Sequence, residues 1–299
     1  MTTVCWPLRS FLFVPAHRRS WIAKAVQCGP DAVVLDLEDS VPPEQQEAAR
    51  ACLPEAIAEL AAQRIAPFVR VHPIGPGTAQ EVGAAVHPGL AGVMLPKAHD
   101  ADQIRQLHDL LSFHEGRRGL AHGEVAILPL PETAVGLQNA ESLARASSRV
   151  RGIVGTVSGP VAADVARAFG FRASLGGLEQ LYLNSKLVLD SRAAGAEFPI
   201  AGVFGVPLDD LDATRALLER ARDLGYSGSP VMHPSHVAIA NAVYAPTAEE
   251  AEYFQGLLDA FAQAENAGAG AVRYRGAMVD YAMLPQARRV VEQFRRRSP

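Results

Sequence analysis

Eight short apolar segments lie along the first 234 residues, and helix-like stretches separate most of them. Each segment is roughly five to nine residues long and nearly continuous in apolar character, which is typical of strands buried on both faces, as in a parallel sheet. The segments are residues 10–16, 32–39, 67–73, 90–97, 124–132, 150–158, 200–206 and 228–234. This regular α/β order predicts a (β/α)₈ TIM barrel, with an open doubly wound sheet as the alternative.

Helices are expected between the strands and in a C-terminal helical extension. The expected barrel helices are residues 18–28, 44–64, 101–114, 133–146, 161–169, 178–194 and 209–224. After the barrel the pattern changes to two helices, 246–265 and 284–297, around a glycine-rich break at 267–276. We therefore expect a catalytic barrel domain at 1–234 and an extension at 235–299 that packs on the barrel or on a neighbouring subunit.

Composition argues against several classes of partner and site. With 28 basic and 32 acidic residues the net charge is −4, which leaves no electrostatic footprint for nucleic acid. The three cysteines, Cys5, Cys28 and Cys52, form no CxxC pair, so neither disulfides nor a zinc site is expected. No apolar run approaches the roughly 18 residues of a membrane span, and the first residues do not resemble a signal peptide. These features favour a cytoplasmic protein with a small-molecule substrate and no membrane partner.

Polar side chains end the apolar segments, and the carboxyl ends of the strands carry the chemistry in such a barrel. Acids and bases both occur among them, so charged groups are expected to gather on one face, as they also would on a merely structural rim. The residues at or just after strand ends include Asp36, Glu38, Asp39, Arg70, His72, Lys97, Glu132, Ser158, Asp164 and His233. The histidines are expected to make supporting hydrogen bonds rather than to react.

Three of these side chains suggest ligand binding. Glu132 and Asp164 are the expected metal ligands, because they come from adjacent strand ends and Mg²⁺ typically takes one or two protein carboxylates. The competing interpretations are a first-turn helix carboxylate for Glu132 and a solvated helix residue for Asp164. Arg70 lies inside an apolar segment, where its charge must meet an anion. That anion is either a substrate carboxylate or an internal partner, Asp36 or Glu38.

Seven sequence blocks, which follow one another over nearly the whole chain, resemble the citrate lyase β-subunit-like family of the aldolase and citrate lyase superfamily. The blocks are RSFLFVPAHR at 9–18, DAVVLDLEDSVPP at 31–43, VRVHP at 69–73, LPK at 95–97, PETAVGLQNAESLA at 131–144, MHPSHVAIANAVYAPTAEE at 232–250 and GAMVDYAMLPQA at 276–287. The resemblance implies a (β/α)₈ barrel that forms a homotrimer or a dimer of trimers. It also implies a Mg²⁺-dependent carbon–carbon lyase.

The same resemblance implies a substrate class and a set of site residues. The substrate would be a 3-hydroxy dicarboxylyl-CoA thioester of the malyl-CoA, citramalyl-CoA or citryl type, and the products a keto acid and an acyl-CoA. Its site residues would be Arg70 on the keto-acid carboxylate, Arg18 and Lys97 on substrate, Glu132 and Asp164 on the metal, and Glu38 and Asp39 near the metal's water shell. Asp280 would reach a neighbouring subunit's site, as the base or as the group that handles the thioester α-proton.

One segment departs from the family pattern. The family usually carries its metal-binding aspartate in a short loop after the sixth strand, and Asp164 is the sole carboxylate in 155–171. Either the loop is longer here and Asp164 is the ligand, or Ser158 or Pro160 occupies the aspartate's place and the metal site is damaged. Two other functions therefore stay open: a pyruvate-dependent aldolase acting on free hydroxy-keto acids, and a non-catalytic accessory subunit.

Overall fold

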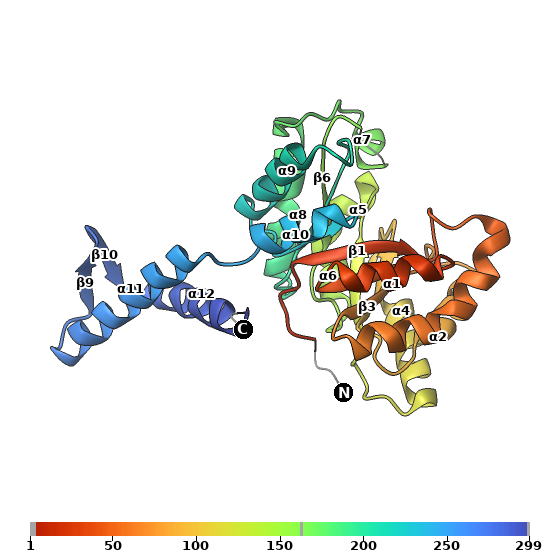
Figure 1. Ribbon diagram of the computed structural model, residues 1–299, viewed down its shortest axis with the longest axis horizontal. Coiled ribbons are helices and arrows are strands. Elements are labelled where there is room, and N and C mark those ends of the chain that lie inside the picture. Colours follow the sequence, from red (N-terminus) through yellow and green to blue (C-terminus); the bar gives the residue numbers. More distant parts are fainter. Residues whose placement is uncertain (1–3, 162–163, 298–299) are drawn as a thin grey trace. The chain divides into compact units, whose positions relative to one another are not determined.

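The computed structural model describes residues 4–161 and 164–297, in which eight parallel strands follow one another in chain order around a curled sheet (Figure 1). They are β1 (Ser10–Pro15), β2 (Ala32–Asp36), β3 (Ala66–Arg70), β4 (Gly92–Pro96), β5 (Ala126–Leu130), β6 (Val154–Ser158), β7 (Ile200–Phe204) and β8 (Ser229–Val231). One sheet has the order β5-β4-β3-β2-β1-β8, and β6 pairs with β7. Parallel bridges from Ile127 to Val150 and from Ile200 to Gly228 link the two sheets. This order confirms the predicted (β/α)₈ fold.

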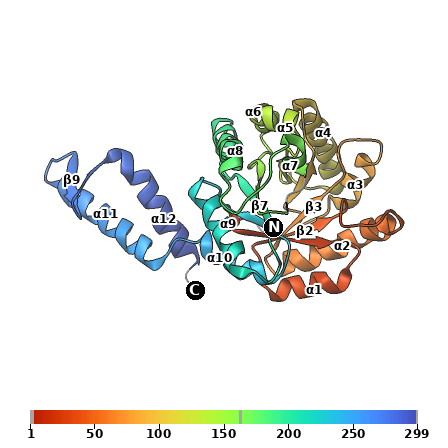
Figure 2. The ribbon, with the colours of Figure 1, turned by 90° about the horizontal axis from the view of Figure 1, so that it is seen from above.

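Helices cover the outside of the strands, as Figure 2 shows for α1, α2, α4, α8 and α9. The helices of this region are α1 (Arg19–Gln27), η1 (Pro43–Gln45), α2 (Gln46–Ala62), α3 (Thr78–Ala85), α4 (Ala101–Arg118), α5 (Ala134–Gln138), α6 (Ala140–Arg145), α7 (Asp164–Phe169), η2 (Leu178–Gln180), α8 (Leu181–Ala193), α9 (Leu211–Asp223) and α10 (Ser235–Val243). Neither α3 nor α10 was expected from the sequence. Within the described ranges, no helix combines the length and apolar character needed to cross a membrane.

Aromatic side chains close the amino-terminal end of the barrel. Trp6 stacks on Phe198 with 5.3 Å between ring centroids, and its edge meets Phe68 at 6.1 Å. Phe68 in turn packs against Phe11 at 5.3 Å, and both are fully buried. Because Trp6 and Phe198 precede β1 and β7, these rings fill the end of the barrel away from the polar strand ends.

The contacts divide the chain into two units, residues 1–242 and 243–299. Most of α10 therefore belongs with the barrel, where Asn241 accepts a hydrogen bond from the Ser10 hydroxyl (2.8 Å) and donates one to the Gly29 carbonyl (3.0 Å). The second unit contains α11 (Ala248–Asn266), β9 (Ala271–Tyr274), β10 (Ala277–Asp280), η3 (Tyr281–Met283) and α12 (Leu284–Arg297).

The second unit has its own small core and one element that the sequence did not predict. Leu257 and Phe261 of α11 pack with Val279 of β10 and Leu284 of α12. The expected glycine-rich break is an antiparallel hairpin of β9 and β10. Its turn residues, Arg275 and Gly276, have φ of 45° and 89°, the left-handed backbone that a tight two-residue hairpin turn requires.

Candidate active site

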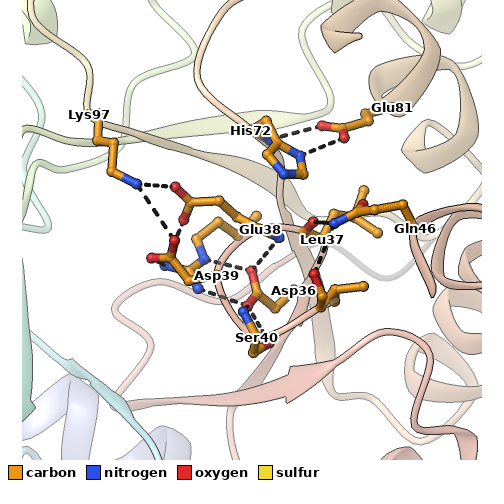
Figure 3. A network of polar contacts seen from close by, with 11 residues as sticks. Asp36, Leu37, Glu38, Asp39, Ser40, Gln46, His72, Glu81 and Lys97 are labelled. Carbon is orange, nitrogen blue, oxygen red and sulfur yellow. Dashed lines mark hydrogen bonds and ion pairs between the residues drawn. The ribbon is translucent and has the colours of Figure 1, made fainter. Parts of the chain in front are cut away.

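A bidentate ion pair between the ends of β2 and β3 forms the centre of the polar cluster (Figure 3). Asp36 and Arg70 are register partners on adjacent strands. Arg70 Nε donates to Asp36 Oδ1 at 2.6 Å and Nη2 donates to Oδ2 at 2.7 Å. Asp36 also accepts the backbone N–H groups of Glu38 (3.0 Å) and Ser40 (3.1 Å), together with the Ser40 hydroxyl. The internal salt bridge considered for Arg70 is thus formed.

Both members of this pair stay charged over a wide pH range. Burial opposes ionisation of Asp36, but the hydrogen bonds and charge of Arg70, with further bonds from Ser40 and Glu38, hold the Asp36 pKa below its ordinary value. Burial likewise acts against the Arg70 charge, and the facing carboxylates outweigh it and raise the Arg70 pKa. The guanidinium lies 5.0 Å from the centroid of the Phe13 ring, which adds a cation–π contact.

Lys97, Glu38 and Asp39 extend the cluster toward β4, and Figure 3 shows the three side chains pointing toward one another. Glu38 lies 3.0 Å from Arg70 Nη1 and 2.5 Å from Lys97 Nζ. Asp39 is 3.7 Å from each of these nitrogens and is 60% exposed. Burial raises the Glu38 pKa, with Asp39 adding to the rise and Lys97 and Arg70 opposing it. Lys97 adopts a φ of 52°, an uncommon backbone for a non-glycine residue that costs about 1 kcal/mol.

The charges of the cluster and of Asp164 act on Glu132. Glu132 follows β5, and its Oε2 is buried with no hydrogen-bond partner among the described residues. Burial raises the pKa of Glu132 to about 7; Glu38 and Asp164 add to the rise, and Arg70 and Lys97 oppose it. Asp164 begins α7, where it forms an ion pair with the exposed Arg167. Its charge nevertheless adds to the rise of the Glu132 pKa.

Comparison with known proteins assigns the family. Residues 9–234 match the sequence model of the HpcH/HpaI aldolase/citrate lyase family. The chain belongs to this family. A citrate lyase subunit beta-like protein of Deinococcus radiodurans is 35% identical, and the alignment covers 94% of this chain and 95% of that one. These matches confirm the resemblance carried by the seven sequence blocks and make the chain a member of a carbon–carbon lyase family.

Other members of the aldolase/citrate lyase family connect it to specific ligands. The mitochondrial citramalyl-CoA lyase of Homo sapiens is 29% identical over 95% of this chain and 85% of its own. Protein CitE of Mycobacterium tuberculosis, solved in complex with magnesium, acetoacetate and coenzyme A, is 27% identical with a TM-score of 0.70, over 95% of this chain and 97% of that one. Magnesium, a keto acid and CoA thus occur together in a relative with this fold.

The donor set here fits a divalent cation of the kind that this lyase family uses. A buried carboxylate oxygen without a donor is costly, and a hard cation would satisfy it. The described residues contain no group of three or more His, Cys, Asp or Glu side chains that could hold a metal. Mg²⁺ does not need one, because water and substrate oxygens complete its shell. Glu132 and Asp164 are the two predicted carboxylate ligands, and that assignment stays a prediction.

The alternative ligand position at Ser158 is already engaged. The Ser158 hydroxyl and backbone N–H both donate to Gln180 Oε1, at 3.3 and 2.9 Å, and Gln180 Nε2 donates back to the Ser158 carbonyl at 2.9 Å. Both residues are buried. This closed arrangement gives Ser158 no part in a metal site, and Asp164 as the second ligand stays a prediction.

Two further predicted site residues have local contacts of their own. Arg18 follows β1 at the carboxyl end of the barrel, is exposed, and stacks over the Trp21 ring at 5.8 Å. Asp280 ends β10 in the second unit, where its carboxylate accepts the Ala282 N–H at 2.9 Å. Their roles toward substrate remain predictions.

The sequence offered one feature of this site only as an alternative and missed two others. The Asp36–Arg70 pair was that alternative, and the structure forms it. Phe13, beneath the guanidinium, gave no signal because it lies within an apolar strand. The hydrogen bond between His72 and Glu81, 2.7 Å from Nδ1 to Oε1, was also missed, because Glu81 belongs to the unpredicted helix α3.

Proposed function

We propose that this chain is a Mg²⁺-dependent lyase that cleaves or forms the carbon–carbon bond of a 3-hydroxy dicarboxylyl-CoA thioester. The observation that carries the proposal is the buried, unpartnered carboxylate oxygen of Glu132 beside Asp164 and the Arg70–Glu38–Lys97 cluster. Relatives named citramalyl-CoA lyase and citrate lyase support this substrate class. The products would be a keto acid and an acyl-CoA.

Each charged side chain has a role that its contacts support. Mg²⁺, when bound, supplies Lewis-acid polarisation of the keto or hydroxyl oxygen, worth several kcal/mol. Glu132 and Asp164 would hold it. Arg70 donates two N–H groups to Asp36. Its remaining N–H donors would orient the keto-acid carboxylate and face the negative charge that develops during cleavage. Lys97 stays charged beside Glu38, which raises the Lys97 pKa against the effect of burial, and would contact the substrate as a cation.

A substrate panel tests the proposal. Purified protein with Mg²⁺ is offered malyl-CoA, citramalyl-CoA and citryl-CoA, and in parallel a free hydroxy-keto acid such as 4-hydroxy-2-oxoglutarate. Cleavage of a thioester, abolished by EDTA and restored by Mg²⁺, is the expected result. Turnover confined to the free acid would instead identify an aldolase. An accessory subunit would cleave neither, and calorimetry would show no Mg²⁺-dependent binding of pyruvate.

Asp280 is the proposed base, acting in the site of a neighbouring subunit of a trimer. Asp280→Asn is expected to lower kcat by roughly 10²–10⁴-fold and to change the Kd for pyruvate little, because an amide cannot accept the proton. Asn caps a helix as well as Asp does, so the hydrogen bond to Ala282 and the melting temperature should persist. A loss of keto-acid binding with an unchanged kcat would make Asp280 structural.

Mixed oligomers test whether the base crosses a subunit boundary. Asp280→Asn and Glu132→Gln each inactivate a homo-oligomer in this proposal. If Asp280 acts in a neighbour's site, co-expression of the two variants should restore activity, because some sites then combine an intact Glu132 with an intact Asp280. Mixtures that stay inactive, while size-exclusion chromatography shows assembly, would place both residues in one subunit's site.

A further inference from the structure

His72 lies at the mouth of the barrel, just after the strand that supplies Arg70. Strand β3 ends at Arg70, and the Val71 N–H still donates to the Met94 carbonyl of β4 at 3.2 Å. His72 therefore follows directly after the strand, at the carboxyl end of the barrel and two residues beyond Arg70.

A buried carboxylate fixes how the His72 ring is held (Figure 3). Glu81 of α3 has a side chain that is 6% exposed, and its two oxygens accept the His72 backbone N–H (2.9 Å) and bond to ring Nδ1 (2.7 Å). An ionised carboxylate only accepts, so Nδ1 carries the hydrogen and the neutral ring presents the Nε2 lone pair. The His72 side chain is 42% exposed, and Nε2 has no hydrogen bond to the described residues.

Two acid–base groups of this rim are already paired. Asp36 is bound by Arg70 and Ser40, and Lys97 is paired with Glu38. The His72 imidazole, with one ring nitrogen open and the other held by Glu81, differs from these paired groups. A carboxylate behind the other nitrogen is the arrangement that holds a histidine in one tautomer and orientation for proton transfer.

We propose that His72 is a catalytic residue that exchanges a proton with the α-carbon of the acyl thioester, and that Glu81 is its positioning residue. The proposal rests on the proposed function. In cleavage the carbon–carbon bond breaks, its electron pair passes to the thioester enolate, and the hydroxyl proton leaves to the base. Protonated His72 then gives its Nε2 proton to the enolate carbon, which forms a C–H bond, and regains a proton from solvent. In condensation the neutral ring removes that proton.

Hydrogen exchange at the thioester isolates this step from the rest of the reaction. Wild-type protein with Mg²⁺ and oxalate is incubated in D₂O with acetyl-CoA and with propionyl-CoA, and mass spectrometry follows deuterium at the α-carbon. His72→Gln is expected to slow incorporation by roughly 10²–10⁴-fold while the Kd for oxalate changes less than about twofold. His72→Asn, whose amide can still donate to Glu81, should behave in the same way if one variant folds poorly. His99→Gln, an exposed histidine after β4, is the matched control and should exchange like wild type.

A spectroscopic readout tests the role of Glu81. In ¹⁵N NMR, His72 of the wild type should be the Nδ1–H tautomer. Glu81→Gln should lose that signature and slow exchange by roughly tenfold or more, though less than loss of the ring does. A variant that slows exchange while the tautomer and ring shifts stay as in wild type would make Glu81 a structural residue only.

The results separate this proposal from the lyase assignment. If the wild type cleaves a thioester of the panel and His72→Gln exchanges the α-proton as fast as wild type, the role of His72 is overturned. The lyase assignment then stands. Wild-type protein that incorporates no deuterium from either acyl-CoA also overturns the role of His72. Failure to cleave any thioester overturns both proposals, and the cleavage assay alone identifies that case.

Discussion

Glu132→Gln is expected to abolish Mg²⁺-dependent turnover and, without Mg²⁺, to stabilise the protein at alkaline pH. Burial raises the Glu132 pKa from 4.5 to about 7, with Glu38 and Asp164 adding to the rise. Because the folded-state pKa is the higher one, the ionised carboxylate destabilises the fold, with no effect below about pH 4.5 and the full effect above about pH 7. A shift of this size corresponds to about 3 kcal/mol at pH 8. Glutamine has the same shape without the charge.

Urea unfolding measures this effect on wild type and variant at pH 5 and pH 8, in EDTA and in Mg²⁺. In EDTA the variant should be more stable at pH 8 and similar to wild type at pH 5. Mg²⁺ should stabilise only the wild type, since a ligand stabilises the state that binds it. Glu141→Gln, an exposed carboxylate on α6, is the matched control and should show neither change.

Two results would contradict the assignment of Glu132. One is turnover above roughly a tenth of wild type in Glu132→Gln, because loss of Lewis-acid stabilisation should cost several kcal/mol. The other is equal stabilisation of both proteins by Mg²⁺, which would place the ion elsewhere. The turnover assay tests the reaction, and the unfolding assay tests Mg²⁺ binding alone. If Glu132→Gln is inactive but Mg²⁺ stabilises it as much as wild type, Glu132 has a structural role and is not a metal ligand.

The barrel strands were predictable because their burial leaves a simple pattern. A strand such as β2, with every residue buried, has to be apolar throughout until the polar group that ends it. Helix α3 left no such pattern. It has eight residues including Gly83, a weak helix former, and packing of Val82 and Ala85 stabilises it. Tertiary contacts that local sequence does not encode therefore decide this element.

The site was predictable in its residue types and less so in its pairings. The end of each strand marks which side chains reach the rim, and this rule found Glu38, Arg70 and Lys97. It could not decide between a substrate and Asp36 as the partner of Arg70, because the answer depends on register between strands. The same rule could not find Glu81, because the side chain of a residue on an unpredicted helix cannot be assigned to a face.

Replacing Arg70 by Met is expected to destabilise the fold by about 3–5 kcal/mol and to abolish keto-acid binding. The substitution keeps the apolar contact with Phe13 but leaves Asp36, which is 1% exposed, without its bidentate partner. Removing one member of a buried ion pair costs this much because the other charge stays buried and uncompensated. Arg70→Lys keeps the charge without the planar fork, so a smaller loss is expected.

A double-mutant cycle with Asp36→Asn separates the ion pair from the role of Arg70 in binding. If the cost of Arg70→Met comes from the stranded carboxylate, the double variant should be less destabilised than the sum of the single ones. The Asp36 pKa is lowered in the fold, so its contribution to stability is present at neutral pH and is lost as the pH falls below 3.8 through the folded-state pKa. The wild type should therefore lose its advantage over Arg70→Met in acid.

Keto-acid binding should respond differently from stability across the same variants. Arg70→Lys, if it remains folded, should bind pyruvate weakly in calorimetry, because a single ammonium cannot hold Asp36 and a substrate carboxylate with the same geometry. Arg70→Met that melts like wild type would show that the ion pair contributes little. Full pyruvate affinity in folded Arg70→Lys would assign the carboxylate to another cation, and Lys97 would then be the first to test, since it shares Glu38 with Arg70.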